Sequence, residues 1–579
     1  MKESVKYLSI AFVLVYSLIG CKTEPVTETN AIVTFCNPVD ISYRFCTDMP
    51  SRREAADPTI VWFRDRYFLF ASKSGGYWHS KDLTNWTFVE TSQIPVEEYA
   101  PTAVNINDTL YFLASSNEKS TLYKSSDPLT GTWQVAKEKL DIPVWDPTLF
   151  LDDDRRLYLY WGCSDKNPIY GIELDYKNNF AFIGERKELL HGNQAQLGWE
   201  VPGDDNTRVN QSPWIEGAWM NKFNGKYYLQ YSGPGTEYKS YSDAVYIADS
   251  PLGPFSLQPH NPFAYKPGGF ADGAGHGSTF ADQQGNYWHI GTSTISQKQI
   301  FERRLGLYPA FFDEQGTLYA STKYGDYPLI MPEKKITSFE EIFPGWMLLS
   351  YNKPVTASSA IDSLPANLMT DENIRTYWAA ASGNAGEYAT LDLGSIEDVY
   401  AVQVNFAEHD TKILGRQKDI YHRYKIEYSE NGTDWAMLMD KSTANTDNSH
   451  AYFQLPQKVA CRYLKVTNVQ VPGGNFAMSG FRVFGKANGA LPEKVTSLDV
   501  QRNQNDKRSV TLTWLKDKNA TGYVISYGVD KNRLYQNYMI YSDTTVTINS
   551  LNANEKYYFT LEAFNESGIT ASGLMIEAQ

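Results

Sequence analysis

The sequence predicts an all-β protein in which a five-bladed β-propeller is followed by two β-sandwiches. Two observations carry this prediction. Aromatic residues make up 14% of the 579 residues, with 40 Tyr, 28 Phe and 14 Trp, and such residues favour strands. A short strand–turn–strand pattern also recurs five times, and no segment between the copies has helical periodicity. The net charge of −14 and the lack of a Lys/Arg-rich run argue against a nucleic acid as the main partner.

The N-terminal segment is predicted to be an export signal. Residues 1–20 contain two lysines and then an apolar run that is too short to cross a membrane comfortably. The run ends in Leu18-Ile19-Gly20-Cys21, which resembles a bacterial lipobox and implies that Cys21 is lipidated. The implied protein is an exported lipoprotein, anchored at the periplasmic face or the cell surface; the alternative is a simple secretory signal with a chance cysteine. Residues 21–34 are polar and are expected to form a flexible tether.

An exported protein can keep disulfides. Cys36 and Cys46 are close enough in sequence to pair, but their spacing does not decide whether they do. Cys163 and Cys461 are expected to lie singly in hydrophobic cores.

Residues 35–335 contain the five repeats and are predicted to form the propeller. Each repeat opens with a short strand, turns on Asp, Asn or Gly, and enters a second strand rich in Tyr, Phe and Leu, which is typical of a β-hairpin. The first positions of the five repeats are Asp57, Ala100, Asp146, Glu216 and His276. Their spacings of 43, 46, 70 and 60 residues match propeller blades with insertions in the longer gaps.

Equivalent positions at the start of the innermost strands of a propeller face one central channel. Three carboxylates and a histidine are therefore expected to converge there from distant parts of the chain. Converging carboxylates repel each other, so at least one should have a raised pKa and hold a proton near neutrality. Hydrolysis of a glycosidic bond requires such a separation of acid from base.

Several motifs surround these positions: Ala56-Asp57-Pro58, Ser80-Lys-Asp-Leu-Thr-Asn-Trp86, Trp145-Asp146-Pro147, Trp214-Ile-Glu216-Gly217-Ala218 and Gly275-His276-Gly277-Ser278. Through them, residues 35–325 resemble glycoside hydrolase family 43, the five-bladed propeller hydrolases of arabinan, xylan and related side chains. The resemblance implies an inverting mechanism that needs no cofactor for its chemistry. It implies that Asp57 is the general base and Glu216 the general acid, and that Asp146 tunes the pKa of the acid and orients it.

Other side chains are candidates for substrate or metal binding. The resemblance implies a calcium ion held near His276 through waters, and the alternative is a hydrogen-bonded core histidine. Arg303 and Arg304 resemble the last-blade segment with its substrate-facing arginine; one is expected in the pocket and the other in solvent, without a choice between them. Three tryptophans flank carboxylate-bearing repeats, and each is expected either to stack on sugar or to pack within a blade: Trp78, Trp145 and Trp214.

The second half is predicted to contain two accessory modules. Residues 345–487 include Asn352-Lys-Pro-Val-Thr-Ala-Ser-Ser359 and Asp371-Glu-Asn-Ile-Arg-Thr-Tyr-Trp378 and resemble a discoidin (factor five/eight type C) jelly-roll sandwich. Such domains bind sugars, in some cases with calcium, or act as spacers; Asp371 lies in the segment similar to a calcium-holding loop. Residues 490–579 include Val510-Thr-Leu-Thr-Trp514, and the spacing from Leu551 to Tyr557 resembles the tyrosine corner of a fibronectin type III domain.

The sequence as a whole predicts an exo-acting glycosidase that removes terminal sugars from plant polysaccharide side chains. The favoured bond is an α-L-arabinofuranoside; a β-D-xyloside and a β-D-galactofuranoside or galactoside are the alternatives within the family. A non-catalytic glycan-binding lipoprotein is the alternative from another class. A retaining fructan-type propeller is disfavoured because Ala55-Ala56-Asp57-Pro58 stands where an Asn-Asp-Pro-Asn-type start is expected. The modules in the second half are expected to act independently of the propeller, unless the sandwich packs on the propeller and supports its pocket.

Overall fold

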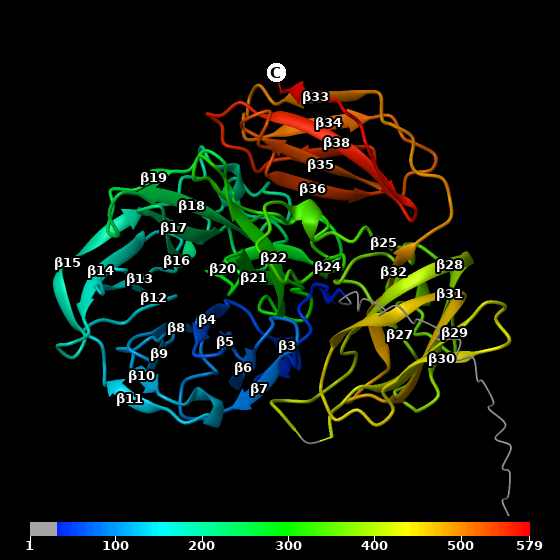
Figure 1. Cartoon of the computed structure of the whole chain (residues 1–579), viewed down its shortest axis with the longest axis horizontal. Coiled ribbons are helices and arrows are strands. Elements are labelled where there is room, and N and C mark those ends of the chain that lie inside the picture. Colours follow the sequence, from blue (N-terminus) through cyan, green and yellow to red (C-terminus); the bar gives the residue numbers. More distant parts are fainter. Residues whose placement is uncertain (1–31, 418, 579) are drawn as a thin grey trace, which may run out of the picture.

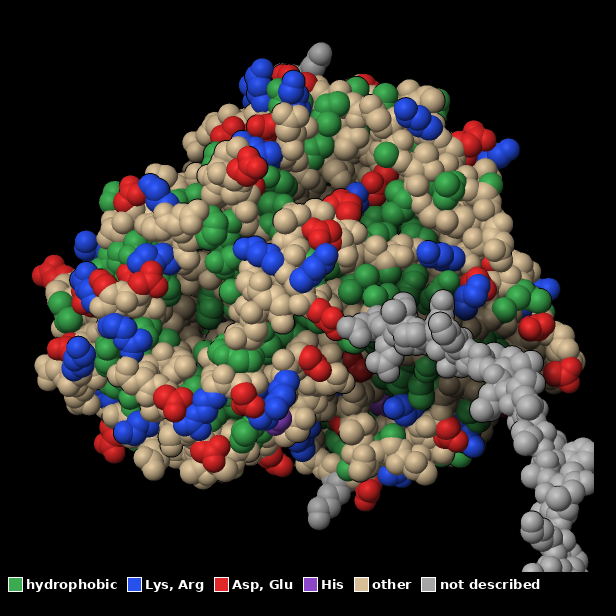
Figure 2. All heavy atoms as spheres, in the orientation of Figure 1, with side chains coloured by type: hydrophobic (Ala, Val, Ile, Leu, Met, Phe, Trp, Pro, Cys, Tyr) green, Lys and Arg blue, Asp and Glu red, His purple; other side chains and the backbone are tan. Residues whose placement is uncertain are grey.

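The computed structural model describes residues 32–417 and 419–578, which form three β domains that each contact the other two (Figure 1). The predicted signal peptide and the lipidation candidate Cys21 lie outside the described residues. Within the described part, no helix has the length and apolar character needed to cross a membrane. Acidic and basic side chains are interspersed over the face seen in Figure 2.

The propeller consists of five four-stranded antiparallel sheets, each built from four consecutive strands. Blades one and two comprise β4 (Thr59–Phe63), β5 (Arg66–Phe70), β6 (Gly76–Ser80), β7 (Thr87–Glu90), β8 (Thr102–Asn105), β9 (Leu110–Leu113), β10 (Leu122–Ser125), η1 (Pro128–Thr130) and β11 (Gln134–Lys137). Blades three to five comprise β12 (Thr148–Leu151), β13 (Leu157–Trp161), β14 (Ile169–Asp175), β15 (Ala181–Leu190), η2 (Gly198–Glu200), β16 (Glu216–Phe223), β17 (Lys226–Gly233), β18 (Ser242–Ala248), β19 (Ser256–Leu257), β20 (Asp272–Ala281), β21 (Tyr287–Thr294), β22 (Arg303–Phe312) and β23 (Leu318–Ala320). The inner strand β20 lies beside β4, so the ring closes without a strand shared between blades.

Aromatic side chains fill the spaces between blades, which explains their abundance in the sequence. Between blades one and two, Trp133 packs against Phe70, Tyr77 and Phe112 with ring centroids 5.8–6.0 Å apart. All four rings are buried. Edge-to-face contacts of this kind add to the free energy gained by burying the ring surface.

Short strands connect the propeller to its surroundings. These strands are β1 (Thr34–Phe35) paired with β24 (Leu329–Ile330), and β2 (Arg44–Phe45) paired with β3 (Arg53–Glu54). The helical turn η3 (Phe339–Glu341) follows β24. Strand β1 begins at Thr34, the last residue of the predicted tether. Cys36 and Cys46 do not form a disulfide: the Cys36 thiol contacts the carbonyl oxygen of Asp326 at 3.0 Å, and Cys46 lies by Glu54.

The first sandwich contains residues 347–486. Its sheet has the order β25-β32-β28-β31-β29-β30, with β26 against β28 and β27 against β32. The elements are β25 (Met347–Leu348), β26 (Val355–Ala357), η4 (Ala366–Met369), β27 (Trp378–Ala379), β28 (Tyr388–Phe406), β29 (Arg423–Ser429), β30 (Ala436–Asp440), β31 (His450–Gln470) and β32 (Ala477–Lys486). Cys461 is buried in its core, as predicted.

The second sandwich contains residues 498–577 and has two sheets, β33-β34-β37 and β36-β35-β38-β39, with β40 against β38. The elements are β33 (Leu498–Arg502), β34 (Val510–Trp514), β35 (Gly522–Gly528), β36 (Gln536–Tyr541), β37 (Thr545–Ile548), β38 (Tyr558–Asn565), β39 (Gly568–Ala571) and β40 (Ile576–Glu577). The predicted tyrosine corner is present, because the backbone N–H of Asn552 donates to the Tyr557 hydroxyl at 2.9 Å.

The three domains share one hydrophobic core, which does not agree with the expectation of independent modules. This core includes Trp288 of the propeller, Phe484 of the first sandwich and Met539 of the second. Buried ion pairs cross the first interface: Arg53 of the propeller binds Glu408 at 2.5 Å and Asp447 at 2.7 Å. The sequence pattern of each domain does not reveal such an interface, since its residues are spread over several loops and strands.

Replacing Arg53 with Met should lower the free energy of unfolding by about 3–5 kcal/mol, because two buried carboxylates lose their cation. Chemical denaturation of the full chain measures the change. The control is Arg64→Met, which removes an exposed pair with Asp108 and should cost less than about 1 kcal/mol. Equal effects of the two substitutions would show that the buried pairs do not hold the domains together.

Candidate active site

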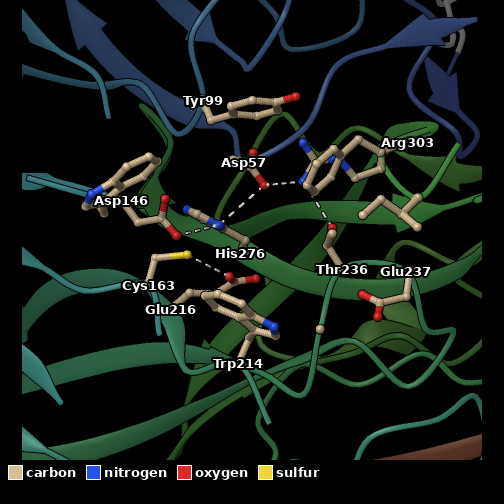
Figure 3. Close-up of a pocket in the computed structure, with 14 residues that line it drawn as sticks. Asp57, Tyr99, Asp146, Cys163, Trp214, Glu216, Thr236, Glu237, His276 and Arg303 are labelled. Atoms are coloured by element: carbon tan, nitrogen blue, oxygen red, sulfur yellow. Dashed lines mark hydrogen bonds and ion pairs between the residues drawn. The ribbon is translucent and has the colours of Figure 1, made fainter. Parts of the chain in front are cut away.

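A pocket with a volume of about 320 Å³ opens at the centre of the propeller. The first positions of four of the five repeats, Asp57, Asp146, Glu216 and His276, line it together (Figure 3). The three carboxylic side chains come from the starts of blades one, three and four and are all buried. The propeller fold therefore brings together residues that occupy equivalent repeat positions and are far apart in the sequence.

The backbone aims these side chains into the channel by an unusual conformation at the start of each blade. Asp57, Ala100, Asp146 and His276 have φ values of 51°, 48°, 50° and 43°, in the left-handed region that costs a non-glycine residue free energy. In blade four the left-handed residue is Gly217, with φ of 63°. A Cβ atom at Gly217 would lie 2.6 Å from the Ser232 hydroxyl, so glycine is required there.

Hydroxyl groups of the preceding blade fix these starting residues. The backbone N–H groups of the four left-handed residues each donate to a Ser or Thr hydroxyl on or just after the second strand of the previous blade. The pairs are Asp57 with Thr292 (2.9 Å), Ala100 with Ser72 (2.8 Å), Asp146 with Ser115 (2.8 Å) and His276 with Ser232 (2.7 Å). Each hydrogen bond joins two neighbouring blades at the edge of the pocket, so the blades position the site jointly.

Asp57 is surrounded by groups that stabilise its ionised form. Arg303 donates to Asp57 Oδ1 at 2.9 Å, and the Ser72 hydroxyl donates to Oδ2 at 2.6 Å. Burial alone would raise the pKa of Asp57, but the positive charge of Arg303, the charge on His276 and the Ser72 hydrogen bond outweigh it and lower the pKa. Glu54 binds the other side of the Arg303 guanidinium at 2.7 Å and holds it in place. Asp57 is therefore a carboxylate at neutral pH.

The pKa of Asp146 is shifted in the opposite direction to that of Asp57. Its burial raises its pKa to about 7, and the negative charges of Glu216 and Asp57 add to this effect, although His276 partly offsets it. The His276 Nδ1 atom lies 3.3 Å from Asp57 Oδ1 and 3.7 Å from Asp146 Oδ2. Burial lowers the pKa of His276, but the surrounding carboxylates more than compensate and raise it. The expectation that one carboxyl group keeps a proton near neutrality therefore holds for Asp146.

Glu216 accepts hydrogen bonds from two groups that the sequence did not indicate. The Tyr241 hydroxyl donates to Glu216 Oε1, and the Cys163 thiol lies 3.2 Å from Oε2. Burial and the nearby carboxylates raise the pKa of both the phenol and the thiol far above their ordinary values, so both are neutral donors. The expectation that Cys163 lies in a hydrophobic core is wrong. It lies two residues after β13, as Ser72 and Ser115 lie two residues after β5 and β9, and it takes the place of their hydroxyl.

Two other expected site residues lie elsewhere. Trp78 is fully buried on β6, the third strand of its blade, where its ring nitrogen donates to Ser42; a third strand lies too far from the channel to reach it. Arg304 is only 1% exposed and is not solvated as expected, because it binds His450 of the first sandwich at 2.8 Å. Successive residues of a strand face opposite sides, so Arg303 faces the pocket and Arg304 faces the interface.

The rim of the pocket is aromatic and partly exposed. Trp145 and Trp214, both predicted, line it and are 39% and 46% exposed, so their faces are open to a ligand. Further lining residues were not predicted: Tyr99, Thr236, Glu237, Ile300 and Phe301. Tyr99 directly precedes a repeat start and could have been found from that position, whereas the others come from loops without a motif.

The calcium ion implied near His276 through waters stays a prediction. The ring nitrogen Nδ1 faces two carboxylates, and calcium prefers six to eight oxygen ligands. The group of side chains with metal-ligand spacing in the described residues is Asp146, Cys163 and Glu216, whose ligand atoms lie within 4.8 Å of one another. It contains a thiol, a soft ligand that does not suit calcium.

Comparison with known families agrees with this geometry. Residues 51–318 match the sequence model of glycosyl hydrolases family 43. The propeller is a family 43 glycoside hydrolase domain. Residues 354–480 match the F5/8 type C domain and residues 493–579 the fibronectin type III domain, so the first and second sandwiches are an F5/8 type C and a fibronectin type III domain.

Individual relatives are distant. The chain is 28% identical over 159 residues to a β-xylosidase of Xylanibacter ruminicola, covering 23% of this chain and 42% of that protein. It is 27% identical over 272 residues to a β-D-galactofuranosidase of Aspergillus niger, covering 41% of this chain and 72% of that protein. A solved glycoside hydrolase structure aligns with a TM-score of 0.46 and 18% identity over 76% of this chain and 99% of its own.

Proposed function

We propose that the protein is an exo-acting, inverting glycoside hydrolase that releases terminal sugars, in the first place α-L-arabinofuranosyl groups, from plant polysaccharide side chains. The observation that carries the proposal is the convergence in one pocket of Glu216, an ionised Asp57 and Asp146, whose pKa is raised to about 7. A lectin has no need of opposite pKa shifts at its binding site. This favours an enzyme over the non-catalytic alternative.

The size of the pocket supports action on a chain end. A volume of about 320 Å³ is at the lower end of the range of ligand pockets, which suits a terminal sugar better than a stretch of polysaccharide. The names of the relatives, a β-xylosidase and a β-D-galactofuranosidase, keep β-D-xylosides and β-D-galactofuranosides as the alternative substrates. Arabinofuranosyl and xylosyl groups are both pentosyl groups and a galactofuranosyl group is larger by one CH₂O unit, so the lining residues alone do not select between them.

In the proposed reaction Asp57 is the general base. It takes a proton from a water molecule whose oxygen attacks the anomeric carbon, while Arg303 and Ser72 keep the carboxylate in place. Glu216, oriented by Tyr241 and Cys163, gives its proton to the leaving oxygen as the glycosidic bond breaks. Asp146, whose pKa is raised to about 7, lies beside Glu216 and helps to orient it. One step inverts the anomeric centre, and exchange with solvent restores both carboxyl groups.

We also propose that the enzyme is an exported lipoprotein anchored through Cys21 at the periplasmic or outer face of a membrane. The support is the pair of lysines, the apolar run of residues 8–20 and the Leu18-Ile19-Gly20-Cys21 sequence. Metabolic labelling with a fatty-acid analogue tests this, since Cys21→Ser should abolish the label.

A panel of aryl glycosides and oligosaccharides tests the reaction and its stereochemistry. We expect hydrolysis of α-L-arabinofuranosides, with proton NMR showing that the first sugar released has the anomeric configuration opposite to that of the substrate. Release of a sugar with the starting configuration would instead make one carboxylate a nucleophile. Absence of hydrolysis across the panel, combined with measurable sugar binding, would establish the lectin alternative.

The roles of the two main carboxyl groups can be separated by leaving-group dependence. Asp57→Asn and Glu216→Gln should each lower kcat by about 10²–10⁴-fold. Glu216→Gln should recover activity on substrates whose leaving group needs no protonation, whereas Asp57→Asn should not. If the two variants respond in the same way to the leaving group, as measured with a series of substituted aryl glycosides, the proposed roles are wrong.

The pH dependence of kcat/KM follows from the two opposite pKa shifts. Asp57 has a lowered pKa, so the base stays ionised until the pH falls below its ordinary value of about 4. The pKa of Asp146 is raised to about 7, so Asp146 loses its proton as the pH rises through about 7. We therefore expect a bell-shaped profile with its alkaline limb near pH 7, and Asp146→Asn should displace that limb. A profile that stays flat to pH 9 would contradict this.

A further inference from the structure

The longest connection between consecutive blades leads directly to the proposed acid. Residues 191–215 join β15 to β16, and we call them the acid insertion. It contains the short helix η2, and its last residues include Trp214, which lies at the pocket rim two residues before Glu216 (Figure 3). Any displacement of this insertion therefore displaces the rim.

The fibronectin type III domain binds the acid insertion through its backbone. Leu197 forms an antiparallel β-bridge with Asn552, the N–H of Gly198 donates to the carbonyl oxygen of Leu551 at 2.9 Å, and the N–H of Ala553 donates to that of Gln196 at 2.8 Å. The two backbones approach so closely that a Cβ atom at Gly198 would lie 2.1 Å from the Asn549 carbonyl oxygen.

The segment that makes this contact is the tyrosine corner. Leu551 and Tyr557 are buried in the core of the fibronectin type III domain, and the Tyr557 hydroxyl accepts the N–H of Asn552. The docking surface thus belongs to a rigid part of the domain. Arg508 of the same domain also donates to the carbonyl oxygen of Gln194, so the acid insertion is attached to a fixed support.

The F5/8 type C domain contacts the acid insertion at a second point. Its Arg375 binds Asp204 of the acid insertion at 2.8 Å and donates to the carbonyl oxygen of Glu237 at 3.4 Å. Glu237 lines the pocket. Asp204 in turn accepts the N–H of Lys239 at 2.8 Å, so Arg375 links the acid insertion to the neighbouring loop that carries Glu237.

Hydrogen bonds also connect the acid insertion to the strand and the loop beside it, at the pocket rim. Glu200 is fully buried and accepts hydrogen bonds from the Tyr231 hydroxyl, at 2.6 Å, and the N–H of Asn193. The N–H of Trp214 donates to the carbonyl oxygen of Pro234 at 2.9 Å, next to the loop with Glu237. The insertion and the rim loop therefore move together.

We propose that both accessory domains form part of the substrate-binding rim, with Gly198 and Arg375 acting as positioning residues for Trp214 and Glu237. The inference rests on the proposed function and deepens it. The proposed catalytic carboxyl groups are buried, whereas Trp214 is 46% exposed and lies at the mouth. The rim therefore contacts the sugar units on the leaving-group side, and the terminal sugar occupies the bottom of the pocket.

Kinetics on two substrates of the full chain test the proposal. Gly198→Val and Arg375→Ala should raise KM for an oligosaccharide about five- to tenfold but leave kcat and KM for an aryl glycoside with a small leaving group within about twofold. Arg375→Lys should recover part of the loss. The controls are Val209→Ala, an exposed residue of the same insertion, and Arg462→Ala, an outer residue of the F5/8 type C domain paired with Asp392; neither should change KM.

Hydrogen exchange gives a readout that does not depend on activity. Amides of residues 193–201 and 235–239 should exchange faster in both variants, with the rest of the propeller unchanged, and neither control should show this. Arg508→Ala, which removes the bond to Gln194 and the ion pair with Asp506 within the fibronectin type III domain, keeps the test decisive if Gly198→Val unfolds. Unchanged exchange, or equal loss of activity on both substrates, overturns the positioning role. Failure of the wild type to hydrolyse any substrate would instead refute the proposed function, and the exchange data would still decide whether the domains fix the rim.

Discussion

The hydrogen bond between a left-handed residue and a hydroxyl of the preceding blade is the contact on which the site depends. At Asp57, Ala100, Asp146 and His276 the backbone turns sharply before the inner strand, a conformation that costs about 1–3 kcal/mol for each residue. Each turn directs a side chain towards the axis and its N–H towards the neighbouring blade, where a hydroxyl accepts it. Blade packing thus supplies the free energy that keeps the carboxyl groups close together despite their repulsion.

Blade four departs from this pattern, and it carries the proposed acid. There the left-handed residue is Gly217, one position later, and the hydroxyl of the preceding blade is replaced by the Cys163 thiol. The thiol contacts the Glu216 side chain, whereas the hydroxyls of the other blades bind backbone N–H groups. A thiol is a weak hydrogen-bond donor, so the Tyr241 hydroxyl is the stronger of the two donors that orient this carboxyl group.

The sequence predicted the site residues that occupy equivalent positions in the repeats, but not the site residues that lie outside those positions. Asp57, Asp146, Glu216 and His276 could be found because repeated motifs mark equivalent positions on inner strands. Tyr241 and Cys163 carry no motif, and their contacts with Glu216 depend on how blades meet in space. The tryptophans were predicted from proximity to the repeats in sequence, which fails for Trp78 because the third strand of a blade does not face the channel.

The domain interfaces could not be predicted, yet they share their residues with the pocket. Strands β3 and β22 lie side by side, and each places neighbouring residues on opposite faces. On one face, Glu54 and Arg303 bind each other and hold Asp57. On the other face, Arg53 and Arg304 bind Glu408 and His450 of the F5/8 type C domain. Only the width of a strand separates the proposed base from the accessory domain, so a movement of that domain against β3 and β22 is also a movement of the arginine that keeps Asp57 ionised.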